Sequence, residues 1–204
     1  MAYVKTNWVD DVTPLSSTNM NNIEDGLVEH IEDNTKHIYK KISEIILDEA
    51  ISQIDFSNIP TGYKHFKLIF EARKNVSIST DLELILNDDV SGNYKRQHIV
   101  ANNTTLSTAG TISSTSMRLH NSLPASTLNF SYGFLDISNF NPLNTKKING
   151  EWYSELGTSS TSLYKVILGG AWINIISEIN KITLRGFDAT VIGVGSRFIL
   201  WGCK

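Results

Sequence analysis

The chain has 204 residues, of which 41% are hydrophobic and 19% charged, and its formal net charge is −3. This composition is typical of a folded protein with a sizeable core, and the slight acidity gives no electrostatic basis for binding DNA or RNA. The single cysteine, Cys203, excludes a framework of intrachain disulfides. No apolar run approaches the ~18 residues that a transmembrane helix needs, so we expect no membrane insertion.

The first 15 residues carry little regular pattern and one large aromatic side chain, Trp8. An extended arm of this kind is typical of a peptide that anchors a protein to a partner, because aromatic side chains often fill interface pockets. A tail that folds back on the chain's own domain is the alternative. The residues expected to anchor the arm are Trp8, Asp10, Val12 and Pro14.

Residues 16–46 place apolar side chains at helical spacing, which predicts one long amphipathic helix within a stalk of residues 16–50. The apolar stripe is thin and its flanks are strongly polar, so we expect the helix to pack against copies of itself as a trimeric coiled coil. A helix lying on the core of its own domain is the alternative. The expected seam of the trimer consists of Met20, Ile23, Leu27, Ile31, Asn34, Ile38, Ile42 and Ile45.

Asn34 is the polar residue in this stripe, and a polar seam residue can fix the register and copy number of a coiled coil. In a symmetric bundle, a ring of Asn34, His30 or His37 side chains is also a place where an ion or a water can bind. No carboxylate or cysteine completes a recognisable set of metal ligands there. We therefore expect neither a metal site nor a cofactor.

After residue 50 the apolar residues alternate at period two, which predicts about eight or nine β-strands separated by turns rich in Gly, Asn, Ser and Thr. No helical pattern alternates with these strands, so an antiparallel β-sandwich or jelly roll over residues 51–204 is favoured over a parallel sheet. The predicted strands are residues 51–56, 66–72, 82–86, 94–100, 128–134, 146–153, 163–168, 181–187 and 197–201.

Two segments of this β-domain carry further information. Residues 101–116 are almost purely small and polar and lack charge, which suits either a weak edge strand or an exposed loop, on a surface that faces protein. Residues 197–201 are apolar on both faces, which is typical of a central strand or of a subunit contact. We expect this last strand to pair with the strand at residues 66–72.

Four stretches of the chain resemble tail and baseplate-associated structural proteins from phages of Gram-positive bacteria. Residues 7–27, NWVDDVTPLSSTNMNNIEDGL, are similar to the N-terminal signature of those proteins, and residues 54–73 and 84–94 to a first core strand and a hairpin of their C-terminal β-domain. Residues 182–204 resemble the closing run of that domain. Asp88 stands where the hairpin usually has Gly, Trp201 stands where the ending usually has Tyr, and residues 101–161 are much less recognisable.

The resemblance implies a non-enzymatic virion structural protein, assembled in the host cytoplasm. It would be a homotrimer in which residues 1–15 dock onto another phage structural protein of the tail, baseplate or neck, residues 16–50 form a three-helix stalk, and residues 51–204 form a β-sandwich head. One alternative is a capsid decoration, head fibre or neck-collar protein. The other is a carbohydrate-binding module that recognises a host-surface glycan.

We expect no catalytic residues. Asp88 and Asp89 are adjacent, so in a strand their side chains would point to opposite faces, and they suit a turn better than an acid–base pair. No nucleophile elbow, metalloprotease helix or phosphate-binding loop occurs in the sequence. Glycan binding would use aromatic side chains near amide groups, and the candidates are Trp152, Tyr153 and Trp172, for each of which packing in a core or interface is the favoured alternative.

Overall fold

The computed structural model describes Asn22 and residues 39–75, 81–124, 129–139, 144–155, 163–174 and 177–204. The chain divides into two units, of which one holds residues 1–39 with 203–204 and the other holds residues 40–202. The predicted arm and the greater part of the predicted helix lie outside the described residues. The predicted anchor, seam and ion-binding roles of residues in these segments therefore remain predictions. These residues are Trp8, Asp10, Val12, Pro14, Met20, Ile23, Leu27, His30, Ile31, Asn34, His37 and Ile38.

The described elements are β-strands and one 3-10 turn, η1 (Phe187–Ala189). The strands are β1 (Lys40–Ile46), β2 (Gln53–Phe56), β3 (His65–Ala72), β4 (Leu82–Leu86), β5 (Tyr94–Asn102), β6 (Thr105–Ser114), β7 (Met117–Leu119), β8 (Ser131–Ser138), β9 (Lys146–Glu155), β10 (Leu163–Trp172), β11 (Ile182–Gly186) and β12 (Arg197–Cys203). No helix in this described part has the length and apolar character needed to cross a membrane.

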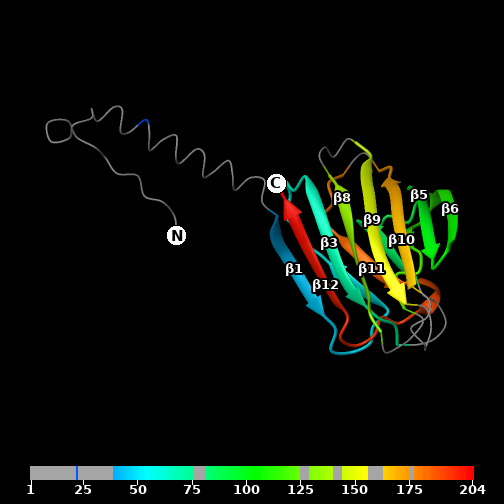
Figure 1. Ribbon diagram of the computed structural model, residues 1–204. Coiled ribbons are helices and arrows are strands. Elements are labelled where there is room, and N and C mark those ends of the chain that lie inside the picture. The colour runs from blue at the N-terminus through cyan, green and yellow to red at the C-terminus, as the bar shows by residue number, and fades with distance from the viewer. Residues whose placement is uncertain are drawn as a thin grey trace, which may run out of the picture. The chain divides into compact units, whose positions relative to one another are not determined.

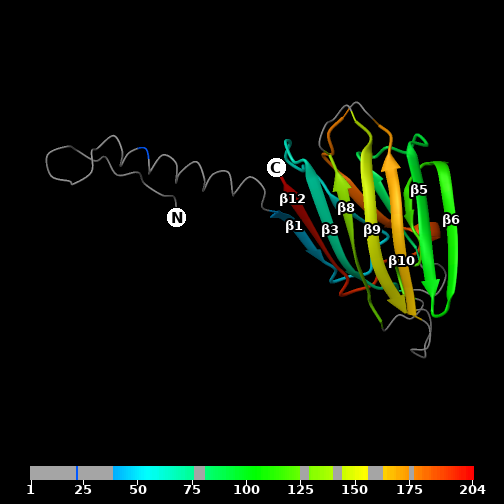
Figure 2. The same ribbon diagram turned by 45° about the horizontal axis from the view of Figure 1, so that its top comes forward.

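The strands form two antiparallel sheets, as predicted for the β-domain. The large sheet has the order β1-β12-β3-β8-β9-β10-β5-β6 (Figures 1 and 2). The small sheet has the order β2-β11-β4-β7. One hydrophobic cluster contains side chains of both sheets, for example Phe70 and Leu168 of the large sheet with Leu84 and Leu184 of the small one. The two sheets therefore share one core, as in a β-sandwich.

Most predicted strands appear where the period-two pattern placed them. The 82–86 prediction matches β4, and the predictions at 66–72, 94–100, 146–153 and 163–168 each lie within a strand that extends further along the chain. Residues 105–114 form β6 at the edge of the large sheet, which decides between the two interpretations of that uncharged segment. The three-residue strand β7 was not predicted.

The predicted helix does not extend to residue 46, because residues 40–46 form β1. Ile42 and Ile45, predicted at the trimer seam, are partly buried and pack against the core of the sandwich. Three residues apart, these side chains would point to opposite faces of a regular strand. However, the register of β1 with β12 is irregular next to Ile42, between Lys41 and Ser43, and Ile45 faces Phe198 in register. Pairing with β12 and burial in the core, which no local pattern reveals, decide the conformation here.

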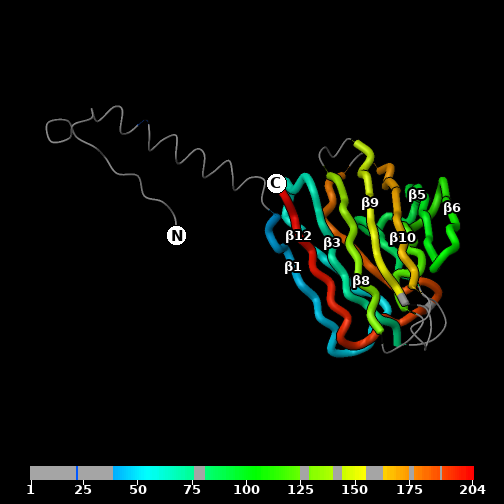
Figure 3. Tube along the Cα trace, viewed as in Figure 1, coloured from blue at the N-terminus to red at the C-terminus, as the bar shows by residue number. Residues whose placement is uncertain are grey.

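The prediction for the last strand is confirmed. β12 lies between β1 and β3 in the large sheet, so it pairs with the strand that contains residues 66–72 (Figure 3). Phe198 and Leu200 are fully buried in the core, whereas Ile199 and Trp201 are partly exposed on the other face. The strand is thus an interior strand whose two apolar faces have different surroundings.

Candidate binding face

The surface of interest is the outer face of the large sheet, the face that points away from the small sheet. Along β9 and β10, buried and more exposed residues alternate, so every second side chain of these strands belongs to the outer face. Paired residues on neighbouring strands of the series β8, β9, β10 and β5 point to the same face, so the outer side chains of each strand lie beside those of the next strand.

Three aromatic residues of the outer face form a strip, which we define as Tyr132, Phe134 and Tyr153. Tyr132 and Tyr153 are directly opposite each other on β8 and β9, and they are 58% and 41% exposed. The ammonium group of Lys67 lies 4.5 Å from the centre of the Phe134 ring. Since the two tyrosine rings are both exposed and adjacent, the strip offers a flat surface to a ligand.

An ion pair borders this aromatic strip. Lys165 Nζ lies 2.7 Å from Glu151 Oε1, and the Tyr153 hydroxyl donates a hydrogen bond to the same carboxylate oxygen at 3.2 Å. The hydrogen bond from Lys165 lowers the pKa of Glu151, and the same bond raises the pKa of Lys165. Both groups are therefore charged at neutral pH and can exchange hydrogen bonds with a polar ligand.

A shallow hollow of about 560 Å³ lies on the outer face over β10, β5 and β6. It is lined by Gln97, His98, Ile99, Thr108, Ala109, Gly110, Ile167 and Gly169. A second hollow of about 300 Å³ shares Gln97, Gly110 and Gly169 with it, so the two are continuous.

The hollow exists because glycines stand where neighbouring strands carry side chains. Gly169 of β10 is in register with Asn149 of β9 on one side and with Gln97 of β5 on the other, and Gln97 faces Gly110 of β6. A Cβ atom added to Gly169 would have only Asn149 Oδ1 near it, at 4.0 Å. Two amide side chains therefore flank an open gap whose floor is backbone.

Of the three candidate glycan contacts predicted from the sequence, only Tyr153 lies on this face. Trp152 and Trp172 are fully buried, so neither ring can stack on a sugar, and that part of the prediction is corrected. Trp152 Nε1 donates to the His120 carbonyl at 2.9 Å, and Trp172 Nε1 donates to Asp89 Oδ2 at 2.7 Å. Both indoles are held in the core by packing and a hydrogen bond, the alternative weighed for them.

Sequence reasoning missed Tyr132 as a surface residue. The alternation that predicted a strand at residues 128–134 did not decide which row is buried, and the inner face of β8 carries Ser131, Gly133 and Leu135. The reason is the bulk of the neighbouring core, since a Cβ atom at Gly133 would lie 2.8 Å from Cζ of Phe70 and would also collide with Trp152.

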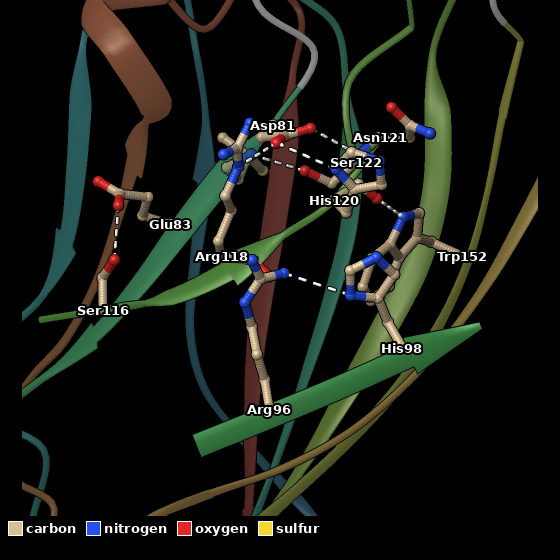
Figure 4. A network of polar contacts seen from close by, with 11 residues as sticks. Asp81, Glu83, Arg96, His98, Ser116, Arg118, His120, Asn121, Ser122 and Trp152 are labelled. Atoms are coloured by element: carbon tan, nitrogen blue, oxygen red, sulfur yellow. Dashed lines mark hydrogen bonds and ion pairs between the residues drawn. The ribbon is translucent and has the colours of Figure 1, made fainter. Parts of the chain in front are cut away.

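The opposite side of the sheet holds a buried polar cluster, which we define as Asp81, Arg96, His98, Arg118 and His120 (Figure 4). The Asp81 carboxylate accepts hydrogen bonds from Arg118 and from the Asn121 amide, the latter at 2.7 Å, and lies 3.3 Å from His120 Nδ1. Burial by itself would raise the pKa of Asp81, but the bonds from His120 and Asn121 and the charge of Arg118 hold it below its usual value. Asp81 is therefore an ionised carboxylate that joins β7 to the start of β4.

His98 belongs to the same cluster and is almost fully buried, with its ring 5.0 Å from that of His120. Its Nδ1 accepts from Arg96 at 3.3 Å. Burial, followed by the nearby Arg96 charge, lowers the pKa of His98 to about 4, so the ring is neutral at physiological pH. The described residues contain no group of three or more His, Cys, Asp or Glu side chains placed to hold a metal ion.

Glu83 lies next to this cluster and is also paired, with Ser116 Oγ at 2.5 Å and Arg185 Nε at 2.7 Å. Most polar side chains at this end of the sandwich thus pair with one another and hold strands of the small sheet together, whereas the buried Arg96 Nε has no hydrogen-bond partner among the described residues. Their arrangement is that of a structural network, and the exposed surface that a ligand can reach is on the outer face.

Comparison with family models, with curated proteins and with solved structures finds no match for this chain.

Proposed function

We propose that the protein is a non-enzymatic virion structural protein, a homotrimeric component of a phage tail, baseplate or fibre. In this proposal residues 1–15 dock onto another virion protein, a helical stalk sets the copy number, and the β-sandwich makes assembly contacts or meets the host. The resemblances in residues 7–27, 54–73 and 182–204 support the class of protein. The observation that carries the contact between copies is the edge strand β6, and the copy number of three comes from the predicted helical stalk.

The ends of the two sheets differ in how they are protected. The edge strand β1 carries Lys40, Lys41 and Glu44 and has a register irregularity, the edge strand β2 carries Asp55, and the edge strand β7 is only three residues long. Charges, bulges and short length are the usual devices that prevent a sheet edge from pairing with another chain. Three of the four edges are therefore blocked.

β6 is less protected, although its register with β5 is irregular between Thr111 and Ser114. It is ten residues long, its sequence TLSTAGTISS contains no charge and no proline, and Leu106 and Ile112 are 73% and 85% exposed. An edge of this kind aggregates unless a specific partner covers it. A neighbouring copy suits this role best, because a trimeric stalk would hold the copies together at high effective concentration and the strand offers no charge to recognise a different partner.

The test is the oligomeric state of the full-length chain and the protection of β6. Light scattering should give three times the 22.8 kDa mass of one chain. Hydrogen exchange should show protected amides along residues 105–114 in the native protein. The double substitution Leu106→Asp and Ile112→Asp should remove that protection while the other strands stay protected. A native protein that is monomeric would refute the proposal.

The stalk and the arm are tested separately. Ile31→Asp combined with Ile38→Asp would place unpaired charges in the expected seam, so the chain should become monomeric by light scattering. Deleting residues 1–14 should leave a folded trimer that no longer enters virions. Normal incorporation of that deletion variant would show that the arm is not the attachment device.

A second candidate function is a carbohydrate-binding module without a virion role, favoured by the exposed aromatic strip beside the hollow. A binding module of that class needs no trimer, so the same light-scattering measurement separates the two. A capsid decoration, head fibre or neck-collar protein would share the trimer, and electron microscopy of labelled particles would distinguish it by position.

A further inference from the structure

The outer face combines three features that no structural role in the sandwich requires. They are the two adjacent exposed rings of Tyr132 and Tyr153, the ion pair of Glu151 with Lys165, and the glycine-floored hollow between Asn149 and Gln97. The strands that carry them, β8, β9, β10 and β5, are consecutive in the large sheet (Figure 2). We infer that these features form one elongated binding site for an oligosaccharide.

The chemistry of the face matches a sugar chain better than other ligands. The rings of Tyr132 and Tyr153 can stack on the C–H face of a pyranose, because aromatic faces are apolar and slightly negative. Glu151 accepts and Lys165 donates hydrogen bonds, and the amides of Gln97 and Asn149 do both, which suits hydroxyl groups. The described residues that line the first hollow carry no charged side chain, whereas the second hollow, which is continuous with it, is also lined by Lys95 and Arg96.

The dimensions are consistent with this ligand class. The volume of about 560 Å³ is within the ~300–1,000 Å³ of small-molecule sites. From β8 to β6 there are four strand spacings of ~4.8 Å, roughly 19 Å in all, a length that a short oligosaccharide can span. The aromatic strip would bind one end of the chain and the hollow the other.

Gly169 is the residue that keeps the hollow open, and its replacement gives a sharp test. Its backbone is not in the left-handed region and a new Cβ would meet only Asn149 Oδ1 at 4.0 Å, so Gly169→Leu should fold normally and fill the hollow. Tyr153→Ala removes half of the platform, while Tyr153→Phe keeps the ring. Val90→Ala, at an exposed residue of the turn between β4 and β5, is the matched control away from this face.

This inference rests on the proposed function, since it names the ligand of the same β-sandwich head. The experiment applies the full-length protein to an array of neutral and acidic oligosaccharides and measures affinity for the best-bound saccharide by calorimetry. We expect Gly169→Leu and Tyr153→Ala each to weaken binding at least about tenfold, Tyr153→Phe to weaken it less than Tyr153→Ala, and Val90→Ala to change it less than about twofold.

Light scattering on the same samples keeps the two proposals distinguishable. A trimer that binds no saccharide on the array, or that binds equally well with Gly169→Leu and Tyr153→Ala, overturns the saccharide site and leaves the trimeric assembly standing. A monomer that binds a saccharide with the expected sensitivity to both substitutions overturns the assembly and supports the site. Unfolding curves of each variant show whether a loss of binding comes from a loss of fold.

Discussion

The two faces of the large sheet use similar residues for opposite purposes, and β9 shows this within two positions. Trp152 is fully buried against Phe70 and donates a hydrogen bond to a carbonyl, whereas Tyr153, the next residue, is 41% exposed and interacts with Glu151 and Lys165. Ionisable groups differ in the same way, since His98 on the inner face of β5 is almost fully buried, whereas Asp136 on the outer face pairs loosely with Lys67 at 3.7 Å. The inner face specifies the fold, and the outer face is free to specify a ligand.

The largest effect on folding is expected when the inner side chains of a whole strand are removed. Truncation after Ser196 deletes β12 with Phe198 and Leu200 and exposes the core that they cover. We expect the truncated chain to be insoluble on expression, whereas removal of Cys203 and Lys204 alone should be tolerated. A soluble product ending at Ser196 that unfolds cooperatively would show that β12 is not an essential part of the core.

A single substitution on each face makes the comparison quantitative. Trp152→Ala should lower the free energy of unfolding by ~3–5 kcal/mol, because it leaves a large cavity and an unpaired carbonyl. Tyr153→Ala should lower it by less than about 1 kcal/mol, because the side chain is already partly in water. Urea unfolding monitored by circular dichroism gives both values. Equal losses would mean that the outer face also contributes to the core.

The buried polar cluster predicts a pH dependence that the outer face lacks. The pKa of His98 is about 4 in the folded protein and near 6.5 when unfolded, so the unfolded state binds a proton first as the pH falls. Stability from this group is complete above pH ~6.5 and decreases towards pH ~4, with a slope of at most about 1.4 kcal/mol per pH unit. Urea unfolding at several pH values should show this slope.

His98→Gln should flatten the slope between these pH values. His65→Gln, on the outer face of β3, is the matched control and should leave the slope in place. A slope that persists in His98→Gln would assign the pH dependence to other groups, of which the partly buried Asp81 pair with Arg118 and His120 is the nearest.

The smallest effect is expected for the outer ion pair. Asp136→Asn removes the charge partner of Lys67, and both side chains are more than a third exposed. Solvent screens such pairs, so the free energy of unfolding should change by less than about 0.5 kcal/mol. Urea unfolding at low and high salt measures this, and a larger, salt-sensitive loss would show that the outer face is more tightly organised than its exposure indicates.

The sequence was sufficient to predict the elements whose pattern is local. Alternation predicted β4 at its observed bounds, and the doubly apolar character of residues 197–201 predicted an interior strand beside β3. The helix prediction failed at residues 40–46, where Ile42 and Ile45 have helical spacing but pairing with β12, more than 150 residues away, decides the conformation.

The candidate site was much harder to predict. The hollow arises from an absence of side chains at Gly169 and Gly110, two residues that only the register of β10, β5 and β6 brings together. Tyr132 was not recognised as a surface residue, because its outward position depends on the inner residue Gly133, at which Trp152 leaves no room for a side chain, and no single-strand pattern reports that demand. Cross-strand register determines which side chains meet, and it cannot be deduced from the local periodicity of one strand.

The pairing of the first described strand with the last sets the order in which this domain can be completed. Lys40 of β1 is in register with Gly202 of β12, and β2 pairs with β11, so the sheets are joined by contacts between opposite ends of the domain sequence. Such long-range closure is slow, and a chain still being synthesised carries β1 and β3 without the strand that lies between them. In the nascent domain, the edges of β1 and β3 that pair with β12 therefore remain without this partner until β12 has emerged from the ribosome. During that interval, pairing of these strand edges with other nascent chains must be prevented by factors outside the domain or by rapid synthesis.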